Sequence, residues 1–280
     1  FALGEFLPEK AQEFDRNETF DLNIWRKACE LGFVGVFLDE KYGGAGLGFL
    51  EHCLITEEFW AVDAGMGNAV ITATFGSELL KLFGTEEQKQ KYLPPLVQRK
   101  AIMGCAITEP DAGSDVTCAI TSAVKDKDEW VINGSKMFIT NGTIAKYMNV
   151  FCLTDPDHKD RHQRHSFFIV ETDRKGFQAN KLHGKLGIRA NDTAEVSFSN
   201  VRVPASNLVG QLGYGFRHLM AFFNLTRLDI CAMALGIARA ALEEASNHIK
   251  KRHQFGVPLA SFQGLQFKIA EMATMIRAAR

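Results

Sequence analysis

Two short stretches carry the residue types best suited to holding a polar ligand. Cys105–Asp115 reads C-A-I-T-E-P-D-A-G-S-D, and Asn133–Gly142 reads N-G-S-K-M-F-I-T-N-G. The first predicts a strand over 101–108 that runs into a tight loop, because Pro, Asp, Gly and Ser favour turns. Such a loop directs backbone N–H groups and the hydroxyls of Thr108 and Ser114 toward one small volume, which suits an anionic ligand or one with many acceptors.

The second stretch predicts a β-hairpin. Trp130–Ile132 forms its first strand, Asn133-Gly134 its turn and 136–140 its second strand. Residues two apart in a strand share a face, so Phe138 and Thr140 should present a ring and a hydroxyl together. Taken alone, the first stretch is better interpreted as a glycine-rich turn and the second as an ordinary hairpin, so a cofactor site is predicted only from the two together.

Composition bounds the class of protein. The chain has 280 residues, 46% of them hydrophobic, enough for one large domain or two to three small ones. A formal net charge of −1 gives no electrostatic case for nucleic acid. No unbroken apolar run reaches the roughly 18–20 residues of a membrane span. The six cysteines are scattered without a C-x-x-C pair, so we expect a reducing compartment and neither disulfides nor zinc.

Three histidines between Asp155 and His165 are the best metal candidates, but that segment is charged and loop-like. We interpret it as a solvated surface loop and predict no metal site, since zinc needs a rigid tetrahedral frame. The chain begins at Phe1 without methionine or signal peptide and stops at Arg280 inside a helical pattern. We therefore expect a fragment at both ends.

The order of elements predicts an α+β fold with several domains. Residues 1–99 read as an N-terminal helical domain, 100–208 as a middle β barrel or sandwich, and 209–280 as the start of a C-terminal helical bundle. In the first, Asp21 caps a predicted helix over 22–31, helices follow near 49–63 and 66–83, and Thr85 with Gln88 forms a capping box. The glycine-rich stretch 42–48 lacks a P-loop ending and is interpreted as a structural loop.

The C-terminal part begins with an apolar stripe from Gly213 to about Arg252, which predicts one helix of about 60 Å packed in a bundle or at a subunit contact. Asn224 and Arg227 share a face beside that stripe. They either reach a ligand or form an ordinary polar contact on the helix surface. Gly256-Val257-Pro258 breaks the chain, and another helix starts near Ser261.

The chain resembles the acyl-CoA dehydrogenase family of FAD-dependent flavoproteins over essentially its full length. The family's flavin loop reads roughly T-E-P-x-A-G-S-D, and its following strand reads G-x-K-x-(W/F)-I-T-N. Further matching segments are Tyr42-Gly-Gly-Ala-Gly46, Gly84-Thr-Glu-Glu-Gln-Lys89, Lys91-Tyr-Leu-Pro94, Leu186-Gly-Ile-Arg189, Val201-Arg-Val-Pro204 and Arg252-His-Gln-Phe-Gly256.

The resemblance implies a role for individual residues. Cys105, Ile107 and Thr108 match positions that contact the flavin ring, and Ser114 matches one at the FAD pyrophosphate that also borders acyl-CoA. Phe138 matches the aromatic shield on the ring, where many members have Trp. Thr140 matches a residue beside the ring's N5. Arg252, Phe255 and Gln263 match residues that grip the dinucleotide of FAD bound in a neighbouring subunit. Asn224 and Arg227 match positions near the acyl-CoA entrance.

The resemblance also implies α,β-dehydrogenation of an acyl-CoA thioester. A carboxylate removes the α-proton and the β-hydrogen leaves as hydride to FAD. One branch of the family places this base immediately before the arginine matched by Arg227, where this chain has Thr226. We therefore name no catalytic residue in the chain and expect the base beyond Arg280. Glu109 lies in the flavin loop, and we interpret it as a brace bonded to local backbone.

The resemblance further implies an electron-transfer flavoprotein as acceptor, a homotetramer or homodimer, and a bacterial cytoplasm or mitochondrial matrix. Two other hypotheses stay open at this point. One is an acyl-CoA oxidase or flavin monooxygenase of the same fold, which reoxidises rapidly in air. The other is a non-catalytic scaffold that binds acyl-CoA or flavin, which would lack a carboxylate near the flavin.

Overall fold

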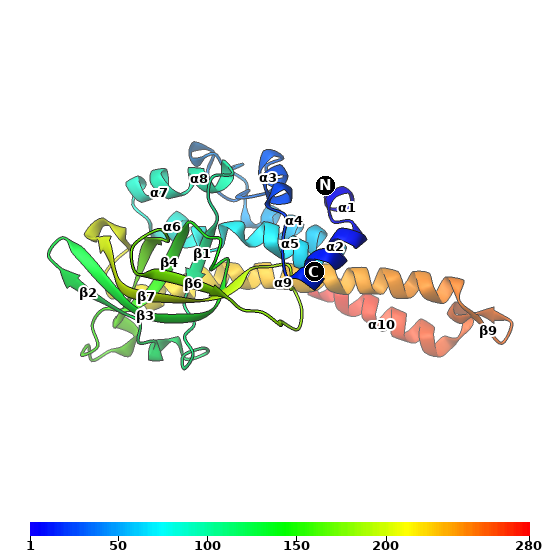
Figure 1. The fold of residues 1–280 in the computed structure, drawn as a ribbon. Coiled ribbons are helices and arrows are strands. Elements are labelled where there is room, and N and C mark those ends of the chain that lie inside the picture. The colour runs from blue at the N-terminus through cyan, green and yellow to red at the C-terminus, as the bar shows by residue number, and fades with distance from the viewer.

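The computed structural model describes residues 1–280, and a β domain lies between two helical regions (Figure 1). This arrangement confirms the predicted α+β fold. The boundaries at 99/100 and 208/209 stay predictions. The N-terminal helices are α1 (Ala2–Glu5), α2 (Pro8–Asn17), α3 (Leu22–Glu30), α4 (Phe49–Val62), α5 (Ala64–Ile71), α6 (Ser77–Phe83), α7 (Glu86–Tyr92) and α8 (Pro94–Val97).

The predicted helix caps of this region are present. The Asp21 carboxylate accepts the Asn23 N–H at 2.9 Å and starts α3. At α7, Thr85 Oγ1 accepts the Gln88 N–H and Gln88 Oε1 accepts the Thr85 N–H, at 3.2 and 3.1 Å. Both caps satisfy amide donors that have no partner inside the helix.

The single helix predicted over 66–83 is wrong. The structure has α5, a short 3₁₀ turn over Thr72–Thr74, and then α6. Gly76 breaks the helix because its φ of +101° is accessible chiefly to glycine. The Gly76 carbonyl accepts a 2.9 Å hydrogen bond from the buried Asn149 side chain on the β domain. The break therefore ties the helices to the sheet.

The β domain is an eight-stranded sheet ordered β6-β7-β3-β2-β4-β5-β8, with β1 parallel to β4. Strands β4 and β5 are buried along almost their whole length, in agreement with their largely apolar sequences. The strands are β1 (Met103–Ala106), β2 (Ser122–Asp126), β3 (Glu129–Thr140), β4 (Tyr147–Leu153), β5 (His165–Glu171), β6 (Phe177–Lys181), β7 (Thr193–Pro204) and β8 (Leu208–Val209).

The predicted hairpin with its turn at Asn133-Gly134 is also wrong. β3 runs unbroken from Glu129 to Thr140, and its hairpin partner is β2, joined through Lys127 and Asp128. Gly134 instead marks a register shift against β7. A Cβ atom on Gly134 would lie 2.5 Å from Thr121 Oγ1, so glycine is required because the segment before β2 approaches closely, and not for a turn.

After the sheet, α9 (Gly215–Lys251) forms the predicted long helix, about 55 Å at 1.5 Å per residue. It packs along α4, where Gly236 lies so close to the Glu57 carbonyl that a Cβ atom would be 2.5 Å away. By length and a mean hydropathy of 1.4, α9 meets the criteria for a membrane span, which bundle helices also meet. Because α9 packs against α4 and α10 (Gln263–Ala279), we interpret it as a bundle helix.

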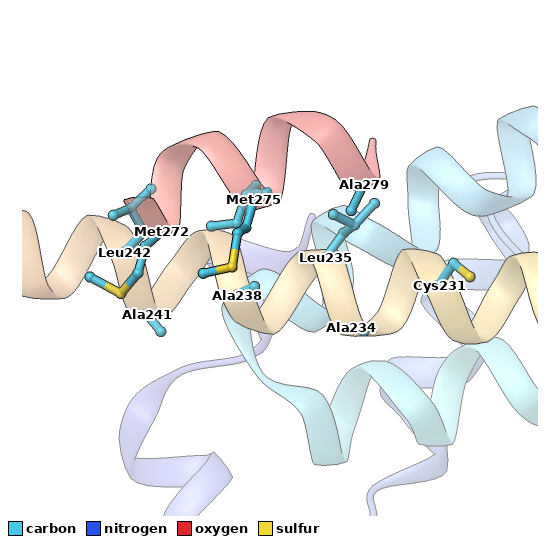
Figure 2. A pocket seen from close by; sticks show the side chains of 10 residues that line it. Cys231, Ala234, Leu235, Ala238, Ala241, Leu242, Met272, Met275 and Ala279 are labelled. Atoms are coloured by element: carbon cyan, nitrogen blue, oxygen red, sulfur yellow. The ribbon is translucent and has the colours of Figure 1, made fainter. Parts of the chain in front are cut away.

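The second half of α9 leaves the body of the protein and pairs with α10, through the short strands β9 (His253–Gln254) and β10 (Val257–Pro258) (Figure 1). Figure 2 shows the groove between the two helices, about 470 Å³ in volume and lined only by apolar side chains. Its lining residues are Cys231, Ala234, Leu235, Ala238, Ala241, Leu242, Met272, Met275, Ile276 and Ala279. Such a face is typical of a helix that has bundle neighbours.

Candidate functional site

A cavity of about 460 Å³ lies where the loop after β1 meets the end of β3 and the side of α9. All six residues of the β domain that the sequence matched to flavin positions line it, namely Cys105, Ile107, Thr108, Ser114, Phe138 and Thr140. Three of the six carry hydroxyls, and the others offer apolar or aromatic surface. The cavity therefore combines a few polar groups with apolar walls, as binding sites for planar organic ligands do.

The loop between β1 and β2 is held by a buried carboxylate. Glu109 Oε2 accepts the Ile120 N–H and Oε1 accepts the Thr121 N–H, both at 2.8 Å. The loop closes on itself through two backbone bonds between Glu109 and Ala112, at 3.0 and 3.2 Å. The prediction that Glu109 braces this loop is confirmed by these contacts.

Lys136 reaches the same carboxylate from β3, with a 2.9 Å ion pair to Glu109 Oε1, and donates to the Ile107 carbonyl at 2.8 Å. Its side chain is fully buried. Burial alone raises the pKa of Glu109, but Lys136 and the two bonded amides hold it below its usual value. Burial lowers the pKa of Lys136, and Glu109 opposes that shift.

The aromatic group at the cavity owes its position to a bulge in β3. The pairing of β3 with β7 shifts between Lys136 and Ile139, and Phe138 has a φ of +61°. The Met137 N–H donates to the Thr108 carbonyl at 2.9 Å, which fastens the bulge to the loop. Bulges redirect side chains at functional sites. Here the bulge leaves Phe138 67% exposed on the cavity.

The helical side of the cavity is aromatic, formed by Phe75 and Phe223. Phe222 contacts both rings, with centroid separations of 5.3 and 5.9 Å. Behind this wall, Glu78 of α6 is fully buried, and its carboxylate accepts the Gly76 N–H at 2.8 Å. Burial raises the pKa of Glu78 to about 7.

Glu78 shares its interior region with a polar cluster from α4 and α9. Asp229 accepts a 2.8 Å hydrogen bond from Thr56, and its carboxylate lies 3.5 Å from His52 Nε2. The charge of His52 favours ionisation of Glu78, whereas Asp229 opposes it. A hydrogen bond therefore connects α4 and α9 in this region, and Glu78 of α6 interacts with the cluster through charge.

Asn224 directly follows the cavity-wall residue Phe223 on α9, and Arg227 lies one turn further along. Arg227 donates to Asn224 Oδ1 at 2.9 Å, and its guanidinium lies 5.8 Å from the centre of the Phe223 ring. Both side chains are exposed. The two residues thus form the helix-surface contact considered from the sequence, and neither lines the cavity.

Arg252, Phe255 and Gln263 do not join the cavity. They lie at the tip of the α9–α10 hairpin, far from the β domain along α9 (Figure 1), and all three are exposed. Phe255 is 93% exposed, with a φ of +53°. A single copy of the chain therefore does not bring these residues and the cavity to one ligand.

Several residues of the site were missed by sequence reasoning. Phe75, Val116, Ile139 and Phe223 line the cavity, yet each reads as core in its own segment. Lys136 lies within the matched strand motif, and a lysine at an inward position of a strand is a signal that could have identified it.

Models of the acyl-CoA dehydrogenase N-terminal, middle and C-terminal domains match residues 1–100, 104–201 and 213–280. An acyl-CoA dehydrogenase of Bacillus subtilis is 41% identical over 281 residues, which cover 100% of this chain and 73% of that protein. The chain belongs to the acyl-CoA dehydrogenase family. It is an FAD-dependent oxidoreductase, as the resemblance implied.

Solved acyl-CoA dehydrogenases share the whole architecture. Butyryl-CoA dehydrogenase from Megasphaera elsdenii is 37% identical with a TM-score of 0.92, over 98% of this chain and 73% of that one. A glutaryl-CoA dehydrogenase from Mycobacterium smegmatis, in complex with FADH2, is 33% identical with a TM-score of 0.89, over 99% and 69% of the two chains. The predicted fold is therefore confirmed by the solved structures of these two relatives.

The residues present fit FAD on physical grounds. The Thr108 N–H has no backbone partner, and the hydroxyls of Thr108, Ser114 and Thr140 donate to no protein group. Phe138 offers an exposed ring face beside them. Free donors next to an aromatic surface suit the heteroatom edge and the face of a flavin ring.

Proposed function

We propose that this acyl-CoA dehydrogenase converts an acyl-CoA thioester into the 2-enoyl-CoA and passes the electrons to an electron-transfer flavoprotein. The observation that carries the proposal is the convergence of six matched residues of the β domain on one cavity beside α9. When bound there, FAD supplies the acceptor for the hydride that leaves the β carbon.

The chain's own residues hold and orient the reactants in this proposal. Thr108 and Thr140 donate hydrogen bonds to the ring, Ser114 lies at the pyrophosphate beside acyl-CoA, and Phe138 covers the ring face. The aromatic wall of Phe75 excludes water from the acyl group, which strengthens every polar contact within the cavity.

Asn224 and Arg227 are proposed to meet the CoA part of the substrate at the cavity entrance. Arg227 carries a fixed positive charge next to Phe223 and has free guanidinium donors beyond its bond to Asn224. An amide and a guanidinium together match the carbonyl and phosphate acceptors of CoA. Thr226 cannot supply the carboxylate that removes the α-proton, so we propose that the base follows the other pattern of the family and lies beyond Arg280.

We further propose that the site is completed between subunits of a homotetramer or homodimer. The exposed Arg252 offers a fork of donors suited to a pyrophosphate, and Phe255 and Gln263 flank it at the hairpin tip. The proposed compartment is a bacterial cytoplasm or a mitochondrial matrix. All six cysteines are unpaired, in agreement with a reducing environment.

The test is a visible spectrum of the full-length, FAD-loaded protein, including the residues expected to supply the base, mixed anaerobically with a panel of acyl-CoA thioesters. We expect bleaching of the flavin by at least one thioester and none by a thioester whose α carbon bears no hydrogen. Turnover with an electron-transfer flavoprotein and slow reoxidation in air would support the acceptor. Rapid reoxidation in air would favour an oxidase, and a protein that never bleaches with any thioester would overturn the proposal.

A further inference from the structure

The positive and negative ends of the buried ion pair Lys136–Glu109 lie differently relative to the cavity. Its positive end bonds the carbonyl of Ile107, which lines the cavity, at 2.8 Å. Its negative end is held by the amides of Ile120 and Thr121, which do not line the cavity. The pair is thus an oriented dipole whose positive end lies directly behind the cavity wall.

The peptide unit between Ile107 and Thr108 connects this dipole to the cavity. No peptide bond in the chain is cis, so the carbonyl and the N–H of this unit point in opposite directions. The carbonyl faces Lys136, and the Thr108 N–H therefore faces away from it. That N–H has no backbone partner, although the Thr108 carbonyl is fixed by the Met137 N–H at 2.9 Å.

We propose that Lys136 is a positioning residue that fixes the Ile107–Thr108 peptide and polarises its N–H, and so raises the reduction potential of the bound flavin. A charge-assisted bond on a carbonyl strengthens the donor at the other end of the same peptide. Reduction by two electrons increases the negative charge on the ring, and a preoriented donor stabilises that charge without reorganisation.

This inference rests on the proposed FAD site but not on the proposed substrate. The readout is the reduction potential of FAD bound to the protein, measured by equilibration with a dye and a chemical reductant. No acyl-CoA and no electron acceptor protein is needed. A wild-type protein that fails to react with thioesters would therefore refute the proposed dehydrogenation and leave this measurement intact.

The first variant is Lys136→Met, which removes the charge and keeps the length of the side chain. We expect the equilibrium constant for two-electron reduction of bound FAD to fall about tenfold, a shift of about 30 mV to more negative potential. The matched control is Lys125→Met on the neighbouring strand β2, because the Lys125 side chain is exposed. The control should leave the potential unchanged.

The second variant is Glu109→Gln, which keeps the size of the side chain and one of its two acceptor oxygens and removes the opposing charge. Measured toward the acidic end of the range in which the protein stays folded, where protonation of Lys136 is favoured, it should move the potential in the positive direction. If Lys136→Met does not retain FAD, this variant decides the question alone. Opposite signs for the two variants support the proposal. Shifts of the same sign would overturn the proposal, and so would the absence of a shift in a variant that retains FAD. A general loss of packing does not depend on the sign of the charge that is removed.

Discussion

Glu78→Gln should make the protein more stable at neutral and alkaline pH. The Glu78 carboxyl is only 4% exposed, and burial raises its pKa from 4.5 to about 7. The His52 charge and the Gly76 N–H favour ionisation, and Asp229 and burial oppose it. At about 1.4 kcal/mol per pKa unit, the raised value corresponds to about 3 kcal/mol.

The sign follows from linkage. Folded Glu78 holds its proton more tightly than the unfolded chain, so its contribution to stability is complete below about pH 4 and is lost as pH rises through about 7. Glutamine cannot ionise and carries no such loss. The free energy of unfolding of Glu78→Gln should therefore gain on that of the wild type by about 3 kcal/mol between about pH 4 and pH 8.

Urea unfolding followed by tryptophan fluorescence at several pH values measures this difference. Glu13→Gln, an exposed position on α2, is the control and should show no pH-dependent difference. A stability difference between Glu78→Gln and wild type that stays constant from acid to alkaline pH would refute the reasoning. It would mean that the buried carboxyl keeps an ordinary pKa or is solvated.

Three further predictions concern single side chains. Thr140→Val should weaken FAD binding about tenfold while the apoprotein unfolds as the wild type does, measured by fluorescence titration, and unchanged affinity would remove Thr140 from the site. Arg252→Ala should also weaken FAD retention about tenfold without changing thermal stability, because Arg252 is exposed, and full yellow colour after dialysis would contradict this. Gly44→Ala should destabilise the fold by about 3 kcal/mol in a thermal melt, because its Cβ atom would lie 2.1 Å from the Leu38 carbonyl, and an unchanged melting temperature would show that the loop relaxes.

The sequence was most informative where local chemistry decides local structure. The caps at Asp21 and Thr85, the long helix α9 and the tight loop near Glu109 were all predictable, because each depends on residues close in the chain. The resemblance then indicated the residues of the cavity, which lie on segments that only the tertiary fold brings together.

The features that the sequence did not predict depend on contacts between segments distant in the chain. Gly134 looked like a turn residue, but it is needed because Thr121 of another segment lies against it. Gly76 separates the 3₁₀ turn from α6, and its carbonyl bonds a buried amide from β4. The partner of Lys136 lies 27 residues earlier in the chain and could not be inferred from spacing. Such contacts depend on which surfaces meet, and no local pattern records that.

The separation of the cavity from the hairpin tip has a genetic consequence. If each FAD takes its ring contacts from one copy and its dinucleotide contacts from another, a Thr140 variant and an Arg252 variant damage different halves of the site (Figure 1). Assembled together, the two variants form one doubly damaged site and one wholly wild-type site for each exchanged pair. Two alleles that each weaken flavin retention should then restore part of each other's flavin content in the same cell.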